Sequence, residues 1–273
     1  MDGVYKVKTG PKITESTPPV PRIRYAACID LLGFRQTYKA LGATKLAQAY
    51  RRAIAVIEAE RQSSQSSFIE IVCAEYPEDE GRPGSADMFA EPKLVGVYKL
   101  YPKIIETVIF SDTFFIFTED DSNDSCRQIA EVANLVFQVC LAHDLPTCGA
   151  IALGEALLWP EERVYLGDAI IDAYELQNSL DIVGIVVHQT AQSAAACFSA
   201  PMNVAVKAPL GHPPMSKMLQ VPLPPGSGHG VTSVTPGGLL ATFRQLQSPL
   251  PPGSKPWAKY DNGLPIVKTM LGI

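Results

Sequence analysis

Short, continuous apolar runs alternate with longer amphipathic segments over the first two thirds of the chain. The run RYAACIDLL, residues 24–32, is typical of a fully buried strand and is closed by Gly33. Residues 37–62 place apolar side chains at helical spacing with charged residues on the other face, and residues 124–144 repeat this pattern. The pattern therefore predicts a strand followed by a helix, and a second helix further along the chain.

The same criteria predict further elements between and after these two helices. They are strands at residues 67–74, 147–159 and 181–188 and a third helix that begins near Gly167 and Asp168. Residues 75–93 are rich in proline, glycine and acidic residues, which predicts a surface insertion. The order of elements predicts an α+β fold, with helices on one face of a mainly antiparallel sheet.

Two aspartates interrupt the apolar pattern where a strand stops. Asp30 lies near the end of the first run, and Asp112 divides residues 104–118 into two strands joined by a tight turn. Aspartate favours turns because it hydrogen-bonds to nearby backbone, so each one alone is explained as a turn residue. If the first strand is central in the sheet, however, the hairpin brings Asp112 beside Asp30. Two carboxylates at neighbouring strand ends could then hold divalent cations.

Composition divides the chain into three segments. Residues 1–22 are polar and contain prolines, and we expect them to form an arm. Residues 23–200 hold all the predicted strands and helices and form the main domain. Residues 201–273 contain proline pairs and glycines, which predict a loop-rich extension packed on the domain.

Charge and hydrophobicity restrict the possible partners. Hydrophobic residues make up 47% of the 273 residues, enough for a substantial core, and the formal net charge is -5. The basic residues form no stripe, which argues against a nucleic-acid polymer as partner. No apolar stretch approaches the roughly 18 residues of a membrane span, and there is no signal-peptide core, so we expect a cytoplasmic protein without a membrane partner. Six cysteines without a CxxC pair are expected to be reduced core residues: Cys28, Cys73, Cys126, Cys140, Cys148 and Cys197.

Four motifs, in the order CIDLLGF, FSDTFFIF, CGAIALGEALL and YLGDAIIDAYELQ, resemble the class III nucleotidyl cyclases. The resemblance covers residues 24–187 and is greatest to the pyrimidine cyclases of bacterial antiphage (Pycsar) defence. It implies a ferredoxin-like βαββαβ palm and active sites shared between the two subunits of a head-to-tail homodimer. It also implies two Mg²⁺ or Mn²⁺ ions held by Asp30 and Asp112, with Leu31 as a further metal ligand. The residues that would lie over the phosphates are Leu32, Gly33, Phe34 and Arg35.

The positions that would read the base differ from those of purine cyclases. The base-reading Lys and Asp of those enzymes match Val108 and Val164, which cannot hydrogen-bond to a purine edge. Tyr50, on the first predicted helix, has two possible roles. It either packs in the core or fills the back of a base pocket that is then small enough for uracil or cytosine.

Further departures concern the charged groups of the resemblance. The transition-state Asn and Arg of the third helix match Ile171 and Glu175, and an Arg common in pyrimidine cyclases matches Cys148. Arg35 and Lys39 are the nearest candidates for a replacement cation, although such side chains are more often merely solvated.

The resemblance leads us to expect a cyclase that converts UTP, in preference to CTP, to the 3′,5′-cyclic monophosphate and pyrophosphate. The product would be a second messenger in antiphage defence, read by a separate effector protein. Two alternatives stay open: a purine cyclase, adenylate or guanylate, and a degenerate cyclase-like protein that only binds nucleotide. Incubation with each of the four ribonucleoside triphosphates separates these possibilities.

Overall fold

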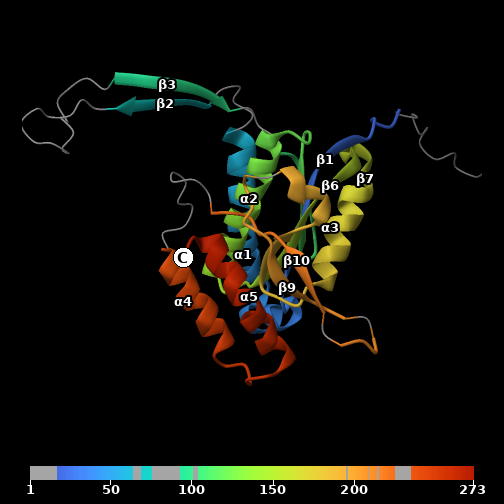
Figure 1. The fold of residues 1–273 in the computed structure, drawn as a ribbon, viewed down its shortest axis with the longest axis vertical. Helices are drawn as coiled ribbons and strands as arrows, with labels where there is room; N and C mark the ends of the chain where they lie inside the picture. Colours follow the sequence, from blue (N-terminus) through green and yellow to red (C-terminus); the bar gives the residue numbers. More distant parts are fainter. Residues whose placement is uncertain are drawn as a thin grey trace, which may run out of the picture.

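The computed structural model describes most of the chain from residue 17 onward (Figure 1). The described residues are 17–63, 69–75, 93–100, 104–194, 196–208, 210–213, 215–224 and 235–273. Most of the predicted arm, residues 1–16, lies outside them, and so do residues 76–92 of the predicted insertion.

A six-stranded sheet forms the centre of the fold (Figure 1). Its strands are β1 (Arg22–Leu31), β4 (Ile104–Phe110), β5 (Thr113–Thr118), β6 (Thr147–Trp159), β7 (Val164–Leu166) and β8 (Gly184–Val187). They follow the order β4-β5-β1-β6-β7, and β8 also pairs with β6. Only the β6–β8 pairing is parallel within this sheet. The mainly antiparallel sheet is thus confirmed, with β1 at its centre.

Three helices follow strands of this sheet in the predicted order. They are α1 (Phe34–Ser63), which is kinked at Gly42, α2 (Asn123–Ala142) and α3 (Asp168–Ser179). The order β1-α1-β4-β5-α2-β6, with β1 between β5 and β6, is the ferredoxin-like βαββαβ arrangement. Short 3₁₀ turns at Pro160–Glu162 and Gln189–Ala194 complete this part of the chain.

Side-chain alternation along β1 explains how the helices are divided between the faces of the sheet. Tyr25 and Ile29 belong to the main core, where α1 and α2 cover one face. Cys28 points the other way and packs with Ala152 and Ala173, which brings α3 against the opposite face. Figure 1 shows α3 on the other side of the sheet from α1 and α2. The contact between α3 and the centre of the sheet is therefore made by small residues.

The C-terminal segment corrects the expectation of a loop-rich extension. It forms the hairpin β9 (Met202–Val206) and β10 (Met215–Leu219) and the helices α4 (Pro236–Gln247) and α5 (Lys255–Leu271). Both helices carry a proline in their first turn and are capped, α4 by Thr235 and α5 by Ser254. Proline is well placed there because the first amides of a helix need no intrahelical partner. Pro236 and Pro256 therefore mark helix starts, whereas Pro213, Pro251 and Pro252 lie in loops as the sequence pattern predicted.

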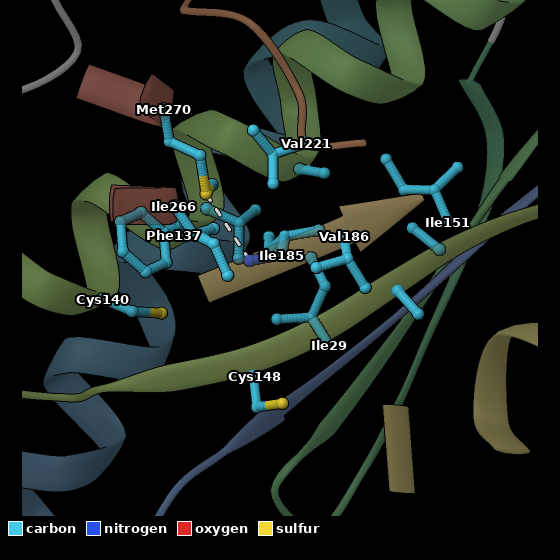
Figure 2. Close-up of a cluster of buried hydrophobic side chains, with 14 of the residues drawn as sticks. Ile29, Phe137, Cys140, Cys148, Ile151, Ile185, Val186, Val221, Ile266 and Met270 are labelled. Carbon is cyan, nitrogen blue, oxygen red and sulfur yellow. Dashed lines mark hydrogen bonds between the residues drawn. The ribbon is translucent and has the colours of Figure 1, made fainter. Parts of the chain in front are cut away.

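These last helices are part of the main core. Ile266 and Met270 of α5 point toward Phe137 of α2 and Ile185 of β8 (Figure 2). The amide of Ile185 donates a hydrogen bond to the sulfur of Met270 at 3.5 Å. Asn134 of α2 is buried, and its side-chain amide donates at 3.0 Å to the carbonyl oxygen of Met270. The C-terminal helices thus bury apolar surface of α2 and β8.

A second pair of strands lies within the chain between α1 and β4. It consists of β2 (Ile69–Glu75) and β3 (Lys93–Leu100), which pair antiparallel as a two-stranded sheet. In the described part of the chain, no helix has the length and apolar character that a membrane span needs.

Candidate functional site

The ends of β1 and of the β4–β5 hairpin meet, and the two aspartates lie at this point. Asp30 is opposite Thr113 in the register of β1 and β5. The Thr113 hydroxyl donates a hydrogen bond to Oδ1 of Asp30 at 3.0 Å. The next backbone amide, that of Leu31, donates to the carbonyl oxygen of Asp112 at 3.0 Å. The structure therefore brings Asp30, Leu31 and Asp112 together at one end of the sheet.

A two-residue turn fixes the backbone of Asp112. Phe110 and Thr113 form the last pair of the hairpin, so Ser111 and Asp112 make the connection. Ser111 has a φ of 57°, in the left-handed region that two-residue hairpin turns use. Asp112 is partly buried. The carboxylate at the tip of the hairpin is thus held close to the sheet and stays accessible to solvent.

The chain turns directly from the first aspartate into α1. The amide of Leu32 donates to the carbonyl oxygen of Pro146 at 2.8 Å, and Gly33 adopts a φ of 70°, which suits glycine best. The helix begins at Phe34, and Arg35 is exposed in its first turn. Helix N-termini attract anions because their first amides lack intrahelical acceptors. The four residues predicted to bind phosphate thus form one turn beside the aspartates, and their role stays a prediction.

Opposing charges act on Asp30. Burial raises the pKa of its carboxyl group, the hydrogen bond from Thr113 lowers it, and Asp112 raises it. Lys207 and Lys259, both from the C-terminal segment, lower the same pKa, and the net shift is upward. The site therefore combines two neighbouring carboxylates with two lysines that no sequence motif indicated.

The donor set of the two aspartates fits a divalent cation that is also bound by substrate. In nucleotide enzymes Mg²⁺ usually takes one or two carboxylates and completes its shell with water and phosphate oxygens. Asp30 and Asp112, with the carbonyl group of Leu31, would supply such a set. Among the residues that the structure describes, no three His, Cys, Asp or Glu side chains are grouped to hold a metal ion. A cation at this site would thus need oxygens from water or substrate.

Tyr50 lies on the α1–α2 side of the sheet, whereas Val108, another predicted base-binding residue, lies on the opposite side. Its ring stacks on Phe114 with centroids 5.4 Å apart and meets Phe34 edge-on at 6.4 Å. It packs against the main core, whereas Val108 packs on the opposite face with Phe117. The sheet separates the two side chains within one chain. The core-packing alternative for Tyr50 is therefore the one that its contacts favour.

Val164 also points away from the face on which Val108 packs. In β7, Tyr165 pairs with Leu158 and joins the cluster that contains Val108 and Phe117, whereas Val164 does not. The ring of Tyr165 stacks on Phe117 at 5.9 Å with an interplanar angle of 4°. Adjacent strand residues face opposite sides, so a one-residue difference in register changes the face. The side chain of β7 on the same face as Val108 is therefore Tyr165.

The positions that depart from the cyclase pattern occupy different environments. On α3, Ile171 is 52% exposed and Glu175 is also exposed. Cys148 is fully buried, with its sulfur 3.9 Å from a carbonyl oxygen in the last turns of α3. Arg35 and Lys39 are exposed.

The cysteines are buried to different degrees. Cys28, Cys126, Cys140 and Cys148 are buried as expected, and Cys197 is partly buried. The side chain of Cys73 lies outside the described residues.

Sequence reasoning missed three residues of this region, for different reasons. Thr113 could have been found, because it directly follows Asp112 and faces Asp30 in the antiparallel register that brings the hairpin turn beside Asp30. Lys207 and Lys259 could not, because their position depends on how the C-terminal segment folds.

Comparison with known proteins gives similarity of fold. No family model matches the chain, and no curated protein matches it. A guanylyl cyclase, Cya2, is similar with a TM-score of 0.48 and 11% identity, over 78% of this chain and 98% of that one. A bacterial light-regulated adenylyl cyclase has a TM-score of 0.43 and 10% identity, over 84% of this chain and all of that one. The adenylyl cyclase CyaB from P. aeruginosa has a TM-score of 0.42 and 8% identity, over 79% of this chain and all of that one. At such identities and scores these similarities assign no activity to the chain.

Proposed function

We propose that this protein is a metal-dependent nucleotidyl cyclase that acts on a pyrimidine nucleoside triphosphate, UTP in preference to CTP. The observation that carries the proposal is the meeting of Asp30 and Asp112 at adjacent strand ends, fixed by the hydrogen bond between Leu31 and Asp112. The sequence motifs that resemble class III cyclases contain both aspartates. A turn residue would need neither this pairing nor a second carboxylate beside it.

The chain supplies a binding surface for a triphosphate around these carboxylates. Asp30 and Asp112 would hold the Mg²⁺ or Mn²⁺ ions, which when bound neutralise phosphate charge and activate the ribose 3′-oxygen. The turn from Leu32 to Phe34 and the first amides of α1 would bind the phosphate oxygens. Thr113 orients the carboxylate of Asp30 by donating to one of its oxygens. The 3′-oxygen would attack the α-phosphorus, and the bond to pyrophosphate would break.

The pyrimidine preference is supported by the face of the sheet on which Asp30 lies. Val108 offers no hydrogen bond, and Phe115 packs beside it on that face. Tyr165 brings bulk and a hydroxyl group to the same cluster. The bulk of Phe115 and Tyr165 suits a one-ring pyrimidine better than a two-ring purine.

A homodimer with shared sites is supported by exposed apolar side chains around α3. They are Phe110 at 78% exposure, Leu166 at 60%, Ile171 at 52% and Tyr174 at 51%. Exposed apolar groups that gather near a site are typical of an interaction surface. The cyclic product would act as a second messenger read by a separate effector protein, and we place this role in antiphage defence.

The test is an assay of the purified chain with each of the four ribonucleoside triphosphates and Mn²⁺, with product identified by mass spectrometry. We expect cyclic UMP and pyrophosphate, and we expect their loss in Asp30→Asn and in Asp112→Asn. The matched control is Asp124→Asn, because Asp124 is exposed in the first turn of α2 and pairs only with a neighbouring arginine. Cyclic purine products alone would favour the purine cyclase, and absence of any pyrophosphate release would favour a binding protein.

A further inference from the structure

Three lysines of the C-terminal segment gather near the end of the sheet where Asp30 lies. They are Lys207, which follows β9, and Lys255 and Lys259 in α5. Burial lowers the pKa of Lys207, and the charge of Lys259 and then that of Lys255 contribute to the decrease. Such a concentration of positive charge is unexpected in a chain with a formal net charge of -5.

Backbone contacts place Lys259 beside the strands that carry the candidate site. Its carbonyl oxygen accepts a hydrogen bond from the amide of Val183 at 3.0 Å. The next residue of β8, Gly184, pairs with Cys148 of β6, and Cys148 pairs with Asp30 of β1. The close approach of α5 is fixed by Gly263, where a Cβ would lie 2.3 Å from the carbonyl oxygen of Val183. Lys259 therefore lies beside β8, at the same end of the sheet as Asp30, with β6 between β8 and the strand that carries Asp30.

The side chain of Lys259 is partly buried, and its ammonium group forms only a long ion pair. Its side chain is 19% exposed, and the nearest carboxylate oxygen, Oδ1 of Asp181, is 3.9 Å from Nζ. This distance is too long for a hydrogen bond. Oδ1 of Asp181 is itself buried and has no hydrogen-bond partner among the described residues. Lys207 differs, because its Nζ donates to the carbonyl oxygen of Asn178 at 2.6 Å.

The long ion pair leaves the Lys259 ammonium group able to bind a further anion, and the neighbouring positive charges of Lys207 and Lys255 favour an anion there. We propose that Lys259 is a binding residue for the terminal phosphates of the nucleotide. This inference rests on the proposed function for the identity of its ligand. Through Lys259, helix α5 would bind substrate directly, although it lies outside the βαββαβ unit. Lys259 would also supply a cation to a site in which Ile171, Glu175 and Cys148 replace the polar and cationic residues of the cyclase pattern.

The first experiment measures binding without any turnover. Inorganic tripolyphosphate is titrated into the wild-type chain and into Lys259→Gln by calorimetry. Loss of a charge-assisted contact should weaken binding by roughly tenfold or more. The control is Lys268→Gln, which removes the same charge from the last turn of α5 and should leave the affinity unchanged. Lys259→Arg keeps the charge and should retain most of the affinity.

The outcomes separate this inference from the proposed function. Equal affinity of Lys259→Gln and wild type for tripolyphosphate, or no binding by the wild type, would overturn the role of Lys259 whatever the activity. Lys259-dependent binding by a chain that forms no cyclic product would support the anion site and count against the cyclase. A melting curve of each variant excludes unfolding, and if Lys259→Gln does not fold, Lys259→Met answers the same question. In an active enzyme, Lys259→Gln should raise KM for the triphosphate more than it lowers kcat.

Discussion

The neighbours of a single aromatic residue, Tyr50, favour core packing over a place in the base pocket. Its ring lies between Phe34 and Phe114, and its hydroxyl group is buried with no hydrogen-bond partner among the described residues. Burial raises the pKa of this hydroxyl, and the charges of Asp112, Cys140 and Asp30 contribute to the increase. Tyr50 thus supports the turn under the two aspartates from the core side of the sheet.

We expect Tyr50→Phe to leave nucleotide preference unchanged and to keep or raise the free energy of unfolding by up to about 1 kcal/mol, because a buried unpaired hydroxyl is removed. Tyr50→Ala should lower the free energy of unfolding by about 2–4 kcal/mol, because the smaller side chain leaves a cavity in the core. Denaturant unfolding and the ratio of pyrimidine to purine turnover measure both effects. Tyr38→Phe is the control, since Tyr38 is 49% exposed. A changed ratio in Tyr50→Phe would restore the base-pocket role.

The residue scale also shows which parts of the site could be predicted from the sequence. Asp30 and Asp112 were found because each interrupts an apolar run, a signal that does not depend on the rest of the fold. Val164 was matched to the base-reading Asp through the family resemblance, and the phase of a three-residue strand cannot be read from its own residues. Only its pairing with β6 determines which side chain faces Val108.

At the scale of elements, the contact of α3 with the sheet depends on Gly154 of β6. A Cβ at this position would lie 2.9 Å from the backbone nitrogen of Ala169, in the first turn of α3. The register of β6 with β1 continues through this glycine. The glycine allows the helix to approach closely, and so it sets the position of Ile171 and Glu175.

Gly154→Ala should therefore lower the free energy of unfolding by about 1–3 kcal/mol, because backbone atoms of α3 must move to accept the methyl group. The same displacement should reduce cyclase activity if α3 contributes to a shared site. The control is Gly237→Ala in α4, where a Cβ meets nothing within 4 Å. Chemical denaturation compares the two variants, and equal stability of Gly154→Ala and wild type would show that α3 adapts without strain.

Sequence patterns predicted elements well where one face of a helix or strand is apolar over many residues. Both long helices, the central strand and the hairpin were found in this way. The C-terminal helices were not, because α4 and α5 begin at Pro236 and near Pro256, and α5 contains Pro265 in its interior. Proline is both a loop residue and a first-turn helix residue, and only the tertiary packing against α2 and β8 distinguishes these uses.

On the scale of the whole molecule, burial is unequal on the two faces of the sheet. The α1–α2 face is closed further by α4 and α5, whose residues Phe243, Ile266 and Met270 belong to the main core. The other face has α3 and leaves Ile171 and Tyr174 of α3 and Phe110 of the β4–β5 hairpin exposed. A second chain that covered this surface would bury it and lie beside the two aspartates. The asymmetry of the fold is therefore the physical argument for self-association.

We expect Ile171→Glu to weaken self-association by roughly tenfold or more, because a carboxylate would have to be desolvated where an apolar side chain is now half exposed. Turnover per chain should fall in parallel and recover at high protein concentration, since sites shared between subunits exist only in the dimer. The control is Leu210→Glu, which adds the same charge at a fully exposed position between β9 and β10. Sedimentation velocity over a concentration series measures association, and the same samples are assayed for product. A monomeric Ile171→Glu chain with full activity would contradict shared sites, because each chain would then hold a complete site of its own.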